Sequence, residues 1–292
     1  MNYNLTAEEE KVLRKLSINV SVKSPQQLQG IHNVSKRGSN IEFREHKQYA
    51  LGDEMRFIDW KAFSRTDRLY IKTFEEEQSL TIYVILDISS SMFHALHKDA
   101  VKKEIVFKTL LYFAYLFRMK KELAGFVTFS SEIDNFRQPK MNFNIPKLFS
   151  DIEKNVSNKK KRRTDYQASL KKAHDIVSQG SLVFIISDLY RDPEEIISFL
   201  KGFLYKKCKV NLVHTVDMDE YNFDIFKDYY FIDSETDEKL YFNSPVLKKD
   251  YRDIFRKHIH DIKQISIEHN IGYFPLFTKM ELLKQFSKIF SA

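Results

Sequence analysis

Cysteine, glycine and proline are scarce in this chain, and each shortage excludes a class of protein. The one cysteine, Cys208, has no second cysteine with which to form an internal disulfide or a thiolate metal cage, which favours a reducing compartment. Only seven glycines and six prolines occur in 292 residues, which excludes collagen-like and low-complexity sequences.

Long hydrophobic runs are also missing. The longest apolar stretch, residues 105–117, contains Lys108 and is shorter than the roughly 20 residues of a membrane-spanning helix. The N-terminal residues lack the basic and apolar regions of a signal peptide. We therefore expect a cytoplasmic protein without membrane insertion.

Core-forming side chains, in contrast, are abundant. Hydrophobic residues make up 43% of the chain and aromatic residues 14%, which is ample for one large α/β domain or for one domain with a smaller companion. The 47 Lys and Arg against 40 Asp and Glu give a net charge of +7, but the carboxylates dilute the positive field that a dedicated nucleic-acid binder needs. We therefore do not expect nucleic acid to be the main partner.

Three mainly apolar stretches have the composition of strands that are covered on both faces in a parallel sheet. They span residues 80–86, 182–186 and 210–216. Amphipathic spacing predicts helices over residues 99–120, 145–156, 166–177, 193–205, 246–269 and 279–290. Further strands are predicted at 123–129, returning as a hairpin by 136, and as an antiparallel pair at 229–232 and 239–242. Because strands and helices alternate, we predict an α/β fold of Rossmann type, a mostly parallel sheet with helices on both faces.

The N-terminal part of the chain follows a different pattern. A capped helix is predicted for residues 6–17, and short alternating runs at 41–44 and 69–74 have the pattern of half-buried strands. We expect two domains. Residues 1–78 form a helix and a small β-rich subdomain, and residues 79–292 form the α/β domain with a C-terminal helical elaboration.

Oxygen-bearing side chains follow the first of the buried strands. Asp87, Ser89 and Ser91 stand at alternate positions of one loop, Asp188 follows another buried strand, and Thr164 opens the loop before a predicted helix. Because the carboxyl ends of parallel strands meet at one edge of a sheet, these side chains are expected to converge there. Hard oxygen ligands of this kind suit Mg²⁺ or Mn²⁺. The alternative is that Asp87 and the serines form a turn that caps the next helix and bind no ion.

Together these residues resemble the metal-ion-dependent adhesion site (MIDAS) of the von Willebrand factor A domain. That site has Asp-x-Ser-x-Ser after the first strand, a Thr in a later loop and an Asp after a further strand. The matching residues of this chain are Asp87, Ser89, Ser91, Thr164 and Asp188.

The segment before the first buried strand strengthens the resemblance. It reads Tyr-Ala-Leu-Gly-Asp-Glu-Met-Arg-Phe-Ile-Asp-Trp from Tyr49 to Trp60, and Ser64-Arg65 and Phe74-Glu75 follow it. This is similar to the signature of the bacterial family catalogued as domain of unknown function 58, in which a von Willebrand A-like domain follows such a segment.

The resemblance implies a fold, a metal and a role. It implies a von Willebrand A-like domain in which Ser89, Ser91 and Thr164 coordinate Mg²⁺ or Mn²⁺ directly or nearly so. Asp87 and Asp188 then act partly through water, and one coordination position stays open for a carboxylate of a partner protein. Relatives are often encoded beside MoxR-type AAA+ ATPases, so we expect a non-enzymatic adaptor or co-chaperone for such an ATPase.

A basic run stands before Thr164, where related chains usually place glycines. It extends from Lys159 to Arg163 and includes Arg162. Five cations beside a metal ion weaken its binding but also attract an acidic partner, which makes Arg162 and Arg163 candidate partner-binding residues. The alternative is a solvated loop with no partner.

Asp53 and Arg56 of the signature segment have two interpretations as well. They are candidates for a docking surface toward a partner protein. Alternatively, they belong to an internal charge network with Asp59 and Arg65, beneath Trp60, the only tryptophan.

Two other functions stay open. A metal-dependent hydrolase or phosphotransferase would act through Asp87, although serines stand where a second acid would be useful. Nucleic-acid binding driven by the basic charge would show a steep loss of affinity with salt. The sequence has no Gly-x-Ser-x-Gly motif, no phosphate loop and no glycine-rich dinucleotide turn.

Overall fold

The computed structural model describes residues 4–18, 41–50, 53, 55–76, 80–93, 99–157, 166–223, 229–232, 239–242 and 244–291. The chain falls into two units, one of residues 25–79 and a larger one of residues 1–24 together with residues 80–292. The larger unit carries the sheet.

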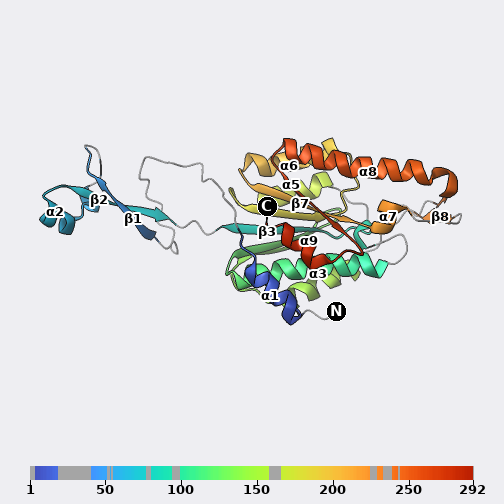
Figure 1. Cartoon of the computed structure of the whole chain (residues 1–292), viewed down its shortest axis with the longest axis horizontal. Helices are drawn as coiled ribbons and strands as arrows, with labels where there is room; N and C mark the ends of the chain where they lie inside the picture. Colours follow the sequence, from blue (N-terminus) through green and yellow to red (C-terminus); the bar gives the residue numbers. More distant parts are fainter. Residues whose placement is uncertain are drawn as a thin grey trace. The chain divides into compact units, whose positions relative to one another are not determined.

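Six strands of the described chain form one sheet in the order β10-β7-β6-β3-β4-β5. Figure 1 labels two of them, β3 and β7. Their bounds are β3 (Thr81–Asp87), β4 (Leu123–Phe129), β5 (Ile133–Lys140), β6 (Leu182–Ser187), β7 (Lys209–Val216) and β10 (Gly272–Phe277). Neighbouring strands are parallel except for the hairpin of β4 and β5, which is antiparallel. The predicted mostly parallel sheet is therefore confirmed.

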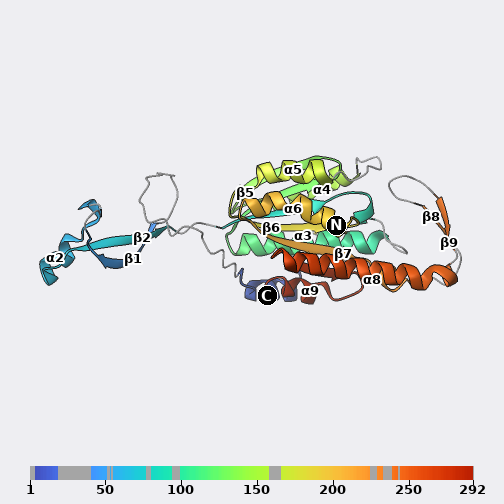
Figure 2. The same ribbon diagram turned by 90° about the horizontal axis from the view of Figure 1, so that it is seen from above.

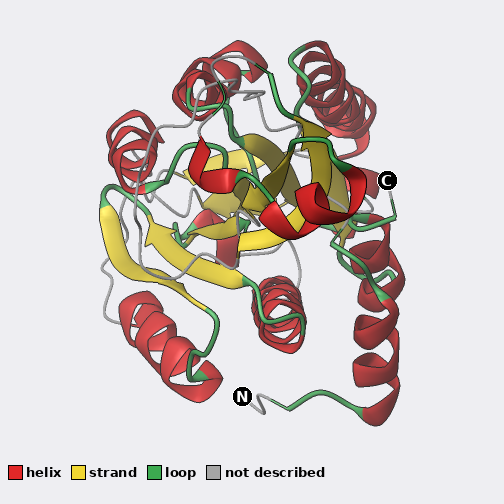
Figure 3. Cartoon of the chain, turned by 90° about the vertical axis from the view of Figure 1, so that its left-hand side faces the viewer, coloured by secondary structure: helices red, strands yellow, loops and turns green. Residues whose placement is uncertain are grey.

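Helices cover both faces of this sheet (Figure 3). Their bounds are α1 (Ala7–Lys15), α3 (Asp99–Met119), α4 (Ile145–Ser157), α5 (Tyr166–Ile176), α6 (Pro193–Tyr205), α7 (Met218–Asn222), α8 (Ser244–Glu268) and α9 (Leu282–Lys288). Ile82 and Val84 of β3 pack into a core with α1, α3, α4 and α9, while Tyr83 and Ile85 pack into a second core with α5, α6 and α8. A strand buried on both faces needs apolar residues at every position, which explains the continuous apolar run of β3.

Helix α1 packs against α3 in the larger unit (Figure 1). Thr6 caps it in a capping box with Glu9, as the sequence pattern predicts. The Glu9 carboxylate accepts a hydrogen bond from the Tyr112 hydroxyl at 2.6 Å and lies 2.7 Å from Lys108 Nζ. The division expected from sequence places this helix with the β-rich segment, whereas in the structure it belongs to the larger unit.

The last strand of the sheet is absent from the sequence-based expectation. No strand is predicted between the helices expected at 246–269 and 279–290, but the structure forms β10 there, parallel to β7. Proline cannot donate to a ladder, and β10 tolerates Pro275 because it is an edge strand. The following helix, α9, begins at Leu282 and packs against β10 and α3. Helix α8 lies beside α6 and β10 (Figure 2).

The smaller unit is built on an antiparallel pair. Strands β1 (Ile41–Gln48) and β2 (Tyr70–Glu76) pair with each other, and η1 (Met55–Phe57) and α2 (Trp60–Thr66) lie between them in the chain. A further antiparallel pair, β8 (Tyr229–Ile232) with β9 (Lys239–Phe242), has the predicted bounds. Within the described ranges, no helix combines the length and the apolar composition that spanning a bilayer requires.

Candidate functional site

The candidate site lies where the order of the strands changes direction. The chain runs from β3 outward through β4 and β5, and then returns to the other side of β3 with β6, β7 and β10. The carboxyl ends of β3 and β6 therefore flank a topological switch point, which is where α/β sheets bind ligands. Asp87 ends β3, Ser187 ends β6, and Asp188 follows immediately.

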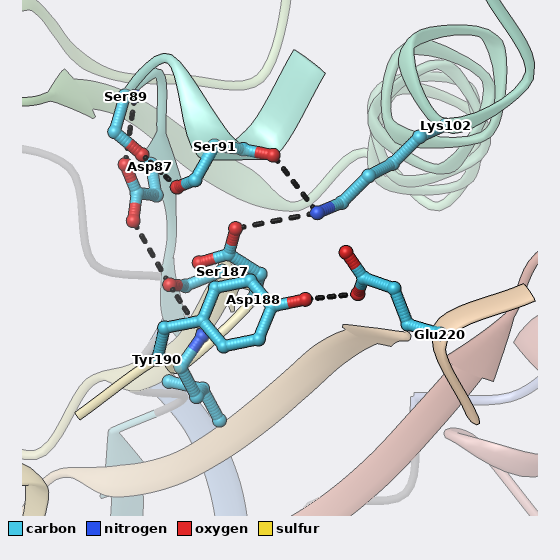
Figure 4. A network of polar contacts seen from close by, with 9 residues as sticks. Asp87, Ser89, Ser91, Lys102, Ser187, Asp188, Tyr190 and Glu220 are labelled. Carbon is cyan, nitrogen blue, oxygen red and sulfur yellow. Dashed lines mark hydrogen bonds and ion pairs between the residues drawn. The ribbon is translucent and has the colours of Figure 1, made fainter. Parts of the chain in front are cut away.

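Asp87 is fully buried and hydrogen-bonded through both carboxylate oxygens (Figure 4). Its Oδ1 accepts a hydrogen bond from the Ser89 backbone N–H at 2.9 Å, and its Oδ2 accepts one from the Ser187 hydroxyl at 2.9 Å. The first bond is the turn expected under the capping alternative. The second joins the ends of two strands, which a local turn does not require.

The serine hydroxyls of the Asp87 loop lie side by side. Ser89 Oγ and Ser91 Oγ are 3.1 Å apart, and Ser91 begins the short helix η2 (Ser91–Phe93). Ser89 is 2% exposed. Two adjacent hydroxyl oxygens next to a carboxylate form a hard donor set.

A buried lysine joins this loop to Asp188. Lys102 of α3 is 1% exposed, and its Nζ donates to the Ser91 carbonyl at 2.9 Å and to Asp188 Oδ2 at 3.3 Å (Figure 4). Asp188 itself is 2% exposed, so the ion pair is buried. Nζ also lies 5.4 Å from the centre of the Tyr190 ring, which is within cation–π range.

Lys102 is a site residue that the sequence interpretation missed. A signal for it exists in α3, because Lys102, Val106, Thr109 and Phe113 follow helical spacing and are all buried. A lysine on the buried stripe of a helix needs a partner for its charge. That requirement points to an acid at the sheet edge.

The loop after β6 is held in an unusual backbone conformation. Leu189 has a φ of 51°, in the left-handed region that residues other than glycine seldom adopt. Its N–H donates to Ser187 Oγ at 3.1 Å, and its carbonyl is bonded by the Arg191 N–H at 2.7 Å and lies 3.1 Å from His258 Nε2. These bonds fix the backbone on both sides of Asp188.

Tyr190 and Glu220 extend the network beyond Asp188. The Tyr190 hydroxyl donates to Glu220 Oε2 (Figure 4). Burial raises the pKa of Glu220, and the charge of Lys102 offsets part of that rise. The Glu220 carboxylate is therefore within electrostatic reach of Lys102.

A neutral histidine borders the same loop. Burial, assisted by the charge of His258, lowers the pKa of His214 to about 3. His214 is 1% exposed, and its Nδ1 lies 2.7 Å from the Tyr273 hydroxyl. At neutral pH this side chain adds no positive charge beside Asp188.

The structure brings together four of the five residues proposed as metal ligands. Asp87, Ser89 and Ser91 share one loop, and Lys102 bridges that loop to Asp188. The fifth, Thr164, lies outside the described residues.

The residues proposed for partner binding are placed only in part. Arg162 and Arg163 lie outside the described residues. In the smaller unit, the Asp53 carboxylate accepts a hydrogen bond from the Ala50 N–H at 2.9 Å, and Arg56 is exposed.

The structure also bears on the charge network expected in the smaller unit. Asp59 caps α2 through the N–H groups of Lys61 and Ala62, and its other oxygen lies 2.8 Å from His46 Nε2. Trp60 is 63% exposed, so Asp59 is not part of a charge network buried beneath it.

The donor set fits a hard cation. Among the described residues, no group of three His, Cys, Asp or Glu side chains is arranged to hold a metal ion. The candidate ligands here are instead two aspartates and two serine hydroxyls, which suit Mg²⁺ or Mn²⁺. The ammonium of Lys102 already lies against Asp188 and the Ser91 loop.

Fold and site together define an α/β protein with a polar site of aspartate, serine and lysine at the switch point of a mostly parallel sheet. The chain belongs to the family described as "Protein of unknown function DUF58", which matches residues 45–263. This confirms the family resemblance carried by the segment from Tyr49 to Trp60. No curated protein matches the chain.

Several solved structures are similar to it at low sequence identity. BatB, a conserved hypothetical protein from Bacteroides thetaiotaomicron, is 12% identical with a TM-score of 0.43, over 73% of this chain and 97% of that one. An aerotolerance-related membrane protein from Bacteroides fragilis is 14% identical with a TM-score of 0.42, over 73% of this chain and 96% of that one. An uncharacterized membrane spanning protein from Vibrio fischeri is 14% identical with a TM-score of 0.24, over 72% and 96% of the two chains. At TM-scores this low, the likenesses support no conclusion about function.

Proposed function

We propose that the larger unit is a von Willebrand A-like domain that binds Mg²⁺ or Mn²⁺ and uses it to bind another protein. The observation that carries the proposal is the hydrogen bond from Ser187 to Asp87, which joins the ends of β3 and β6 at the switch point. It joins the Asp87 loop to the residue before Asp188, and Lys102 connects the same two loops through the Ser91 carbonyl and Asp188. Convergent hard oxygens of this kind favour a divalent ion over a simple turn.

In this proposal, Ser89 and Ser91 hold the ion through their hydroxyls, Asp87 and Asp188 supply negative charge, and Thr164 completes the set. The bound ion would supply an electrophilic centre that attracts an anionic oxygen. The chain's own residues position it and neutralise part of its charge. A carboxylate of the partner protein would neutralise the remaining charge of the ion.

We propose a MoxR-type AAA+ ATPase as the partner and a cytoplasmic adaptor or co-chaperone as the role. The basic residues Arg162 and Arg163 are candidates for attracting an acidic surface of that partner. In the smaller unit, Arg56 and Trp60 are both exposed, which supports the docking-surface interpretation of this segment.

The buried state of Asp87 argues against the rival enzymatic function. A nucleophilic carboxylate must direct a free oxygen at its substrate. Asp87 is 0% exposed, and both of its oxygens accept hydrogen bonds within the protein. A positioning role therefore suits Asp87 better than attack on a substrate.

Thermal unfolding with added Mg²⁺ or Mn²⁺ tests the metal site. At an ion concentration about tenfold above the dissociation constant, we expect roughly 1.4 kcal/mol of stabilisation, a few degrees in melting temperature. Asp87→Ala and Ser91→Ala should lose this shift. Ser90→Ala is the matched control, because it removes a hydroxyl from the same loop at a position outside the Asp-x-Ser-x-Ser set. An equal shift in Asp87→Ala and the wild type would exclude the site.

Binding of the purified ATPase, with and without a chelator, tests the partner. The wild-type chain should bind the ATPase in Mg²⁺ and release it when the ion is chelated. Ser91→Ala should not bind in either condition, whereas Ser90→Ala should behave as the wild type. Chelator-independent binding would contradict the metal-dependent mechanism.

A further inference from the structure

Lys102 places a positive charge inside the candidate metal site. Its Nζ lies 2.9 Å from the Ser91 carbonyl oxygen and 3.3 Å from Asp188 Oδ2 (Figure 4). The side chain is 1% exposed, so water does little to screen this charge. The ammonium therefore joins the same two loops that carry the candidate metal ligands.

We infer that Lys102 is a built-in competitor of the divalent ion, whose ammonium holds Ser91 and Asp188 together until an ion takes its place beside Asp188. This inference rests on the proposed metal site and adds the residue that sets its occupancy. Two cations against one buried carboxylate repel each other strongly in a medium of low dielectric constant. The ion and the ammonium therefore bind Asp188 in alternation.

Alternative partners for the ammonium of Lys102 lie close to it. Its flexible four-carbon chain lets Nζ change partners by rotation alone. The Glu220 carboxylate is within electrostatic reach, since the charge of Lys102 opposes the rise that burial causes in the pKa of Glu220. The Tyr190 ring faces Nζ at 5.4 Å, and its hydroxyl donates to Glu220. Displacement from Asp188 consequently leaves the ammonium near a second acid.

This arrangement has a function in a binding module. Without Lys102, Asp188 would be an unpaired buried carboxylate with a high affinity for any cation. With Lys102, the site keeps a neutralised, hydrogen-bonded state in the absence of metal, so the divalent ion binds only when its concentration is high enough to displace an ammonium. Metal-dependent partner binding then responds to the ion concentration instead of being permanently switched on.

Mn²⁺ titration followed by electron paramagnetic resonance tests the inference, because the signal of free Mn²⁺ reports its affinity directly. Lys102→Met removes the charge and keeps an unbranched side chain that is compatible with a helix. We expect Lys102→Met to bind Mn²⁺ about 10- to 100-fold more tightly than the wild type, the scale on which groups beside a ligand tune metal affinity. Lys103→Met is the matched control, since Lys103 is the next residue of α3 and its Nζ lies over the Phe107 ring at 5.9 Å. It should leave the affinity unchanged.

Lys102→Gln is the second variant, should the methionine variant fold poorly. Glutamine is neutral but retains N–H donors for the Ser91 carbonyl and for Asp188, and its Mn²⁺ affinity should also exceed that of the wild type. Equal or weaker binding in both neutral variants would overturn the inference, and if that binding still depended on Asp87, the proposed metal site would survive. No Asp87-dependent Mn²⁺ binding in any of these proteins would overturn both.

Discussion

Ser187 has two roles at the carboxyl end of β6. Its hydroxyl donates to Asp87 Oδ2 at 2.9 Å and accepts a hydrogen bond from the Leu189 N–H at 3.1 Å. All three residues are at least 98% buried, so water cannot easily replace either hydrogen bond if it is lost. The hydroxyl thereby couples the carboxylate at the end of β3 to the left-handed turn that follows β6.

Replacing this hydroxyl should weaken both ends of the network. We expect Ser187→Ala to lower the free energy of unfolding by about 1–3 kcal/mol, because buried polar groups each lose a hydrogen bond. Urea unfolding monitored by circular dichroism measures the change.

Ser198→Ala serves as the control for that measurement. Ser198 is exposed on α6, and its hydroxyl donates to the Glu195 carbonyl at 2.8 Å. Its loss should change the stability by less than about 0.5 kcal/mol, as is usual at the surface. If the two alanine variants proved equally stable, the Ser187 hydroxyl would have no structural role in joining the strands.

At the scale of elements, α1 is attached to α3 by a buried carboxylate. Burial raises the pKa of Glu9, but hydrogen bonds from Lys108, Tyr112 and Thr6 outweigh it and lower that pKa from 4.5 to about 2. The side chain of Glu9 is 10% exposed, so solvent screens these interactions little. The docking of the helix therefore depends on the charge of Glu9.

This attachment predicts a loss of stability in acid. Unfolded Glu9 takes up a proton near pH 4.5 and folded Glu9 near pH 2, so the unfolded state binds more protons between these values. The stabilisation is complete above pH 4.5 and declines by about 1.4 kcal/mol per pH unit as the pH falls toward 2, about 3 kcal/mol in all. Urea unfolding of the wild type and Glu9→Gln from pH 6 to pH 3 should show the difference between them shrinking as the pH falls.

Glu10→Gln provides the comparison for this pH series. Glu10 pairs with Arg14 on the same helix, but the two side chains are 45% and 66% exposed. Such a surface pair contributes less than about 1 kcal/mol. A difference between the wild type and Glu9→Gln that stayed constant across the pH range would refute the role of the Glu9 charge.

Most helices and strands could be predicted because their signals are local. The acid that follows an apolar run identifies the end of a buried strand, which explains why the sequence places Asp87 and Asp188 at strand ends. Strand β10 could not be found this way, because Pro275 and Gly272 disfavour a strand and only pairing with β7 compensates for them. The bond from Ser187 to Asp87 and the pairing of Lys102 with Asp188 join residues about 100 positions apart, at separations of 100 and 86. Contacts at such separations depend on the order of the strands in the sheet. The local sequence pattern does not show that order.

At the scale of the whole molecule, the two units carry different kinds of side chain. The larger unit holds Asp87 and Asp188 at the switch point of its sheet, whereas the smaller unit exposes apolar and basic side chains. Met55 is 71% exposed and Trp60 63% exposed, with Arg56 exposed between them in the sequence. The family match, residues 45–263, includes parts of both units. Under the proposed function, both units are expected to bind the same partner.

This division predicts that the two contributions can be separated by substitution. Tryptophan and arginine are among the side chains most enriched at the energetic centres of protein interfaces. Trp60→Ala should therefore weaken binding of the proposed ATPase partner by about 2 kcal/mol, or about thirtyfold, while the stabilisation by Mg²⁺ stays at the wild-type level. Calorimetric titration of the ATPase and thermal unfolding with Mg²⁺ measure the two effects on the same preparation.

Tyr205→Ala is the control that distinguishes a docking surface from a general loss of aromatic surface. Tyr205 ends α6 in the larger unit and is 88% exposed, more than Trp60. Its removal should leave the affinity for the ATPase unchanged. If Trp60→Ala bound the ATPase as tightly as the wild type, the smaller unit would have no part in docking, and binding would depend on the Asp87 site alone. If Trp60→Ala also lost the stabilisation by Mg²⁺, the two units would act on the metal together, and the separation of their roles would be wrong.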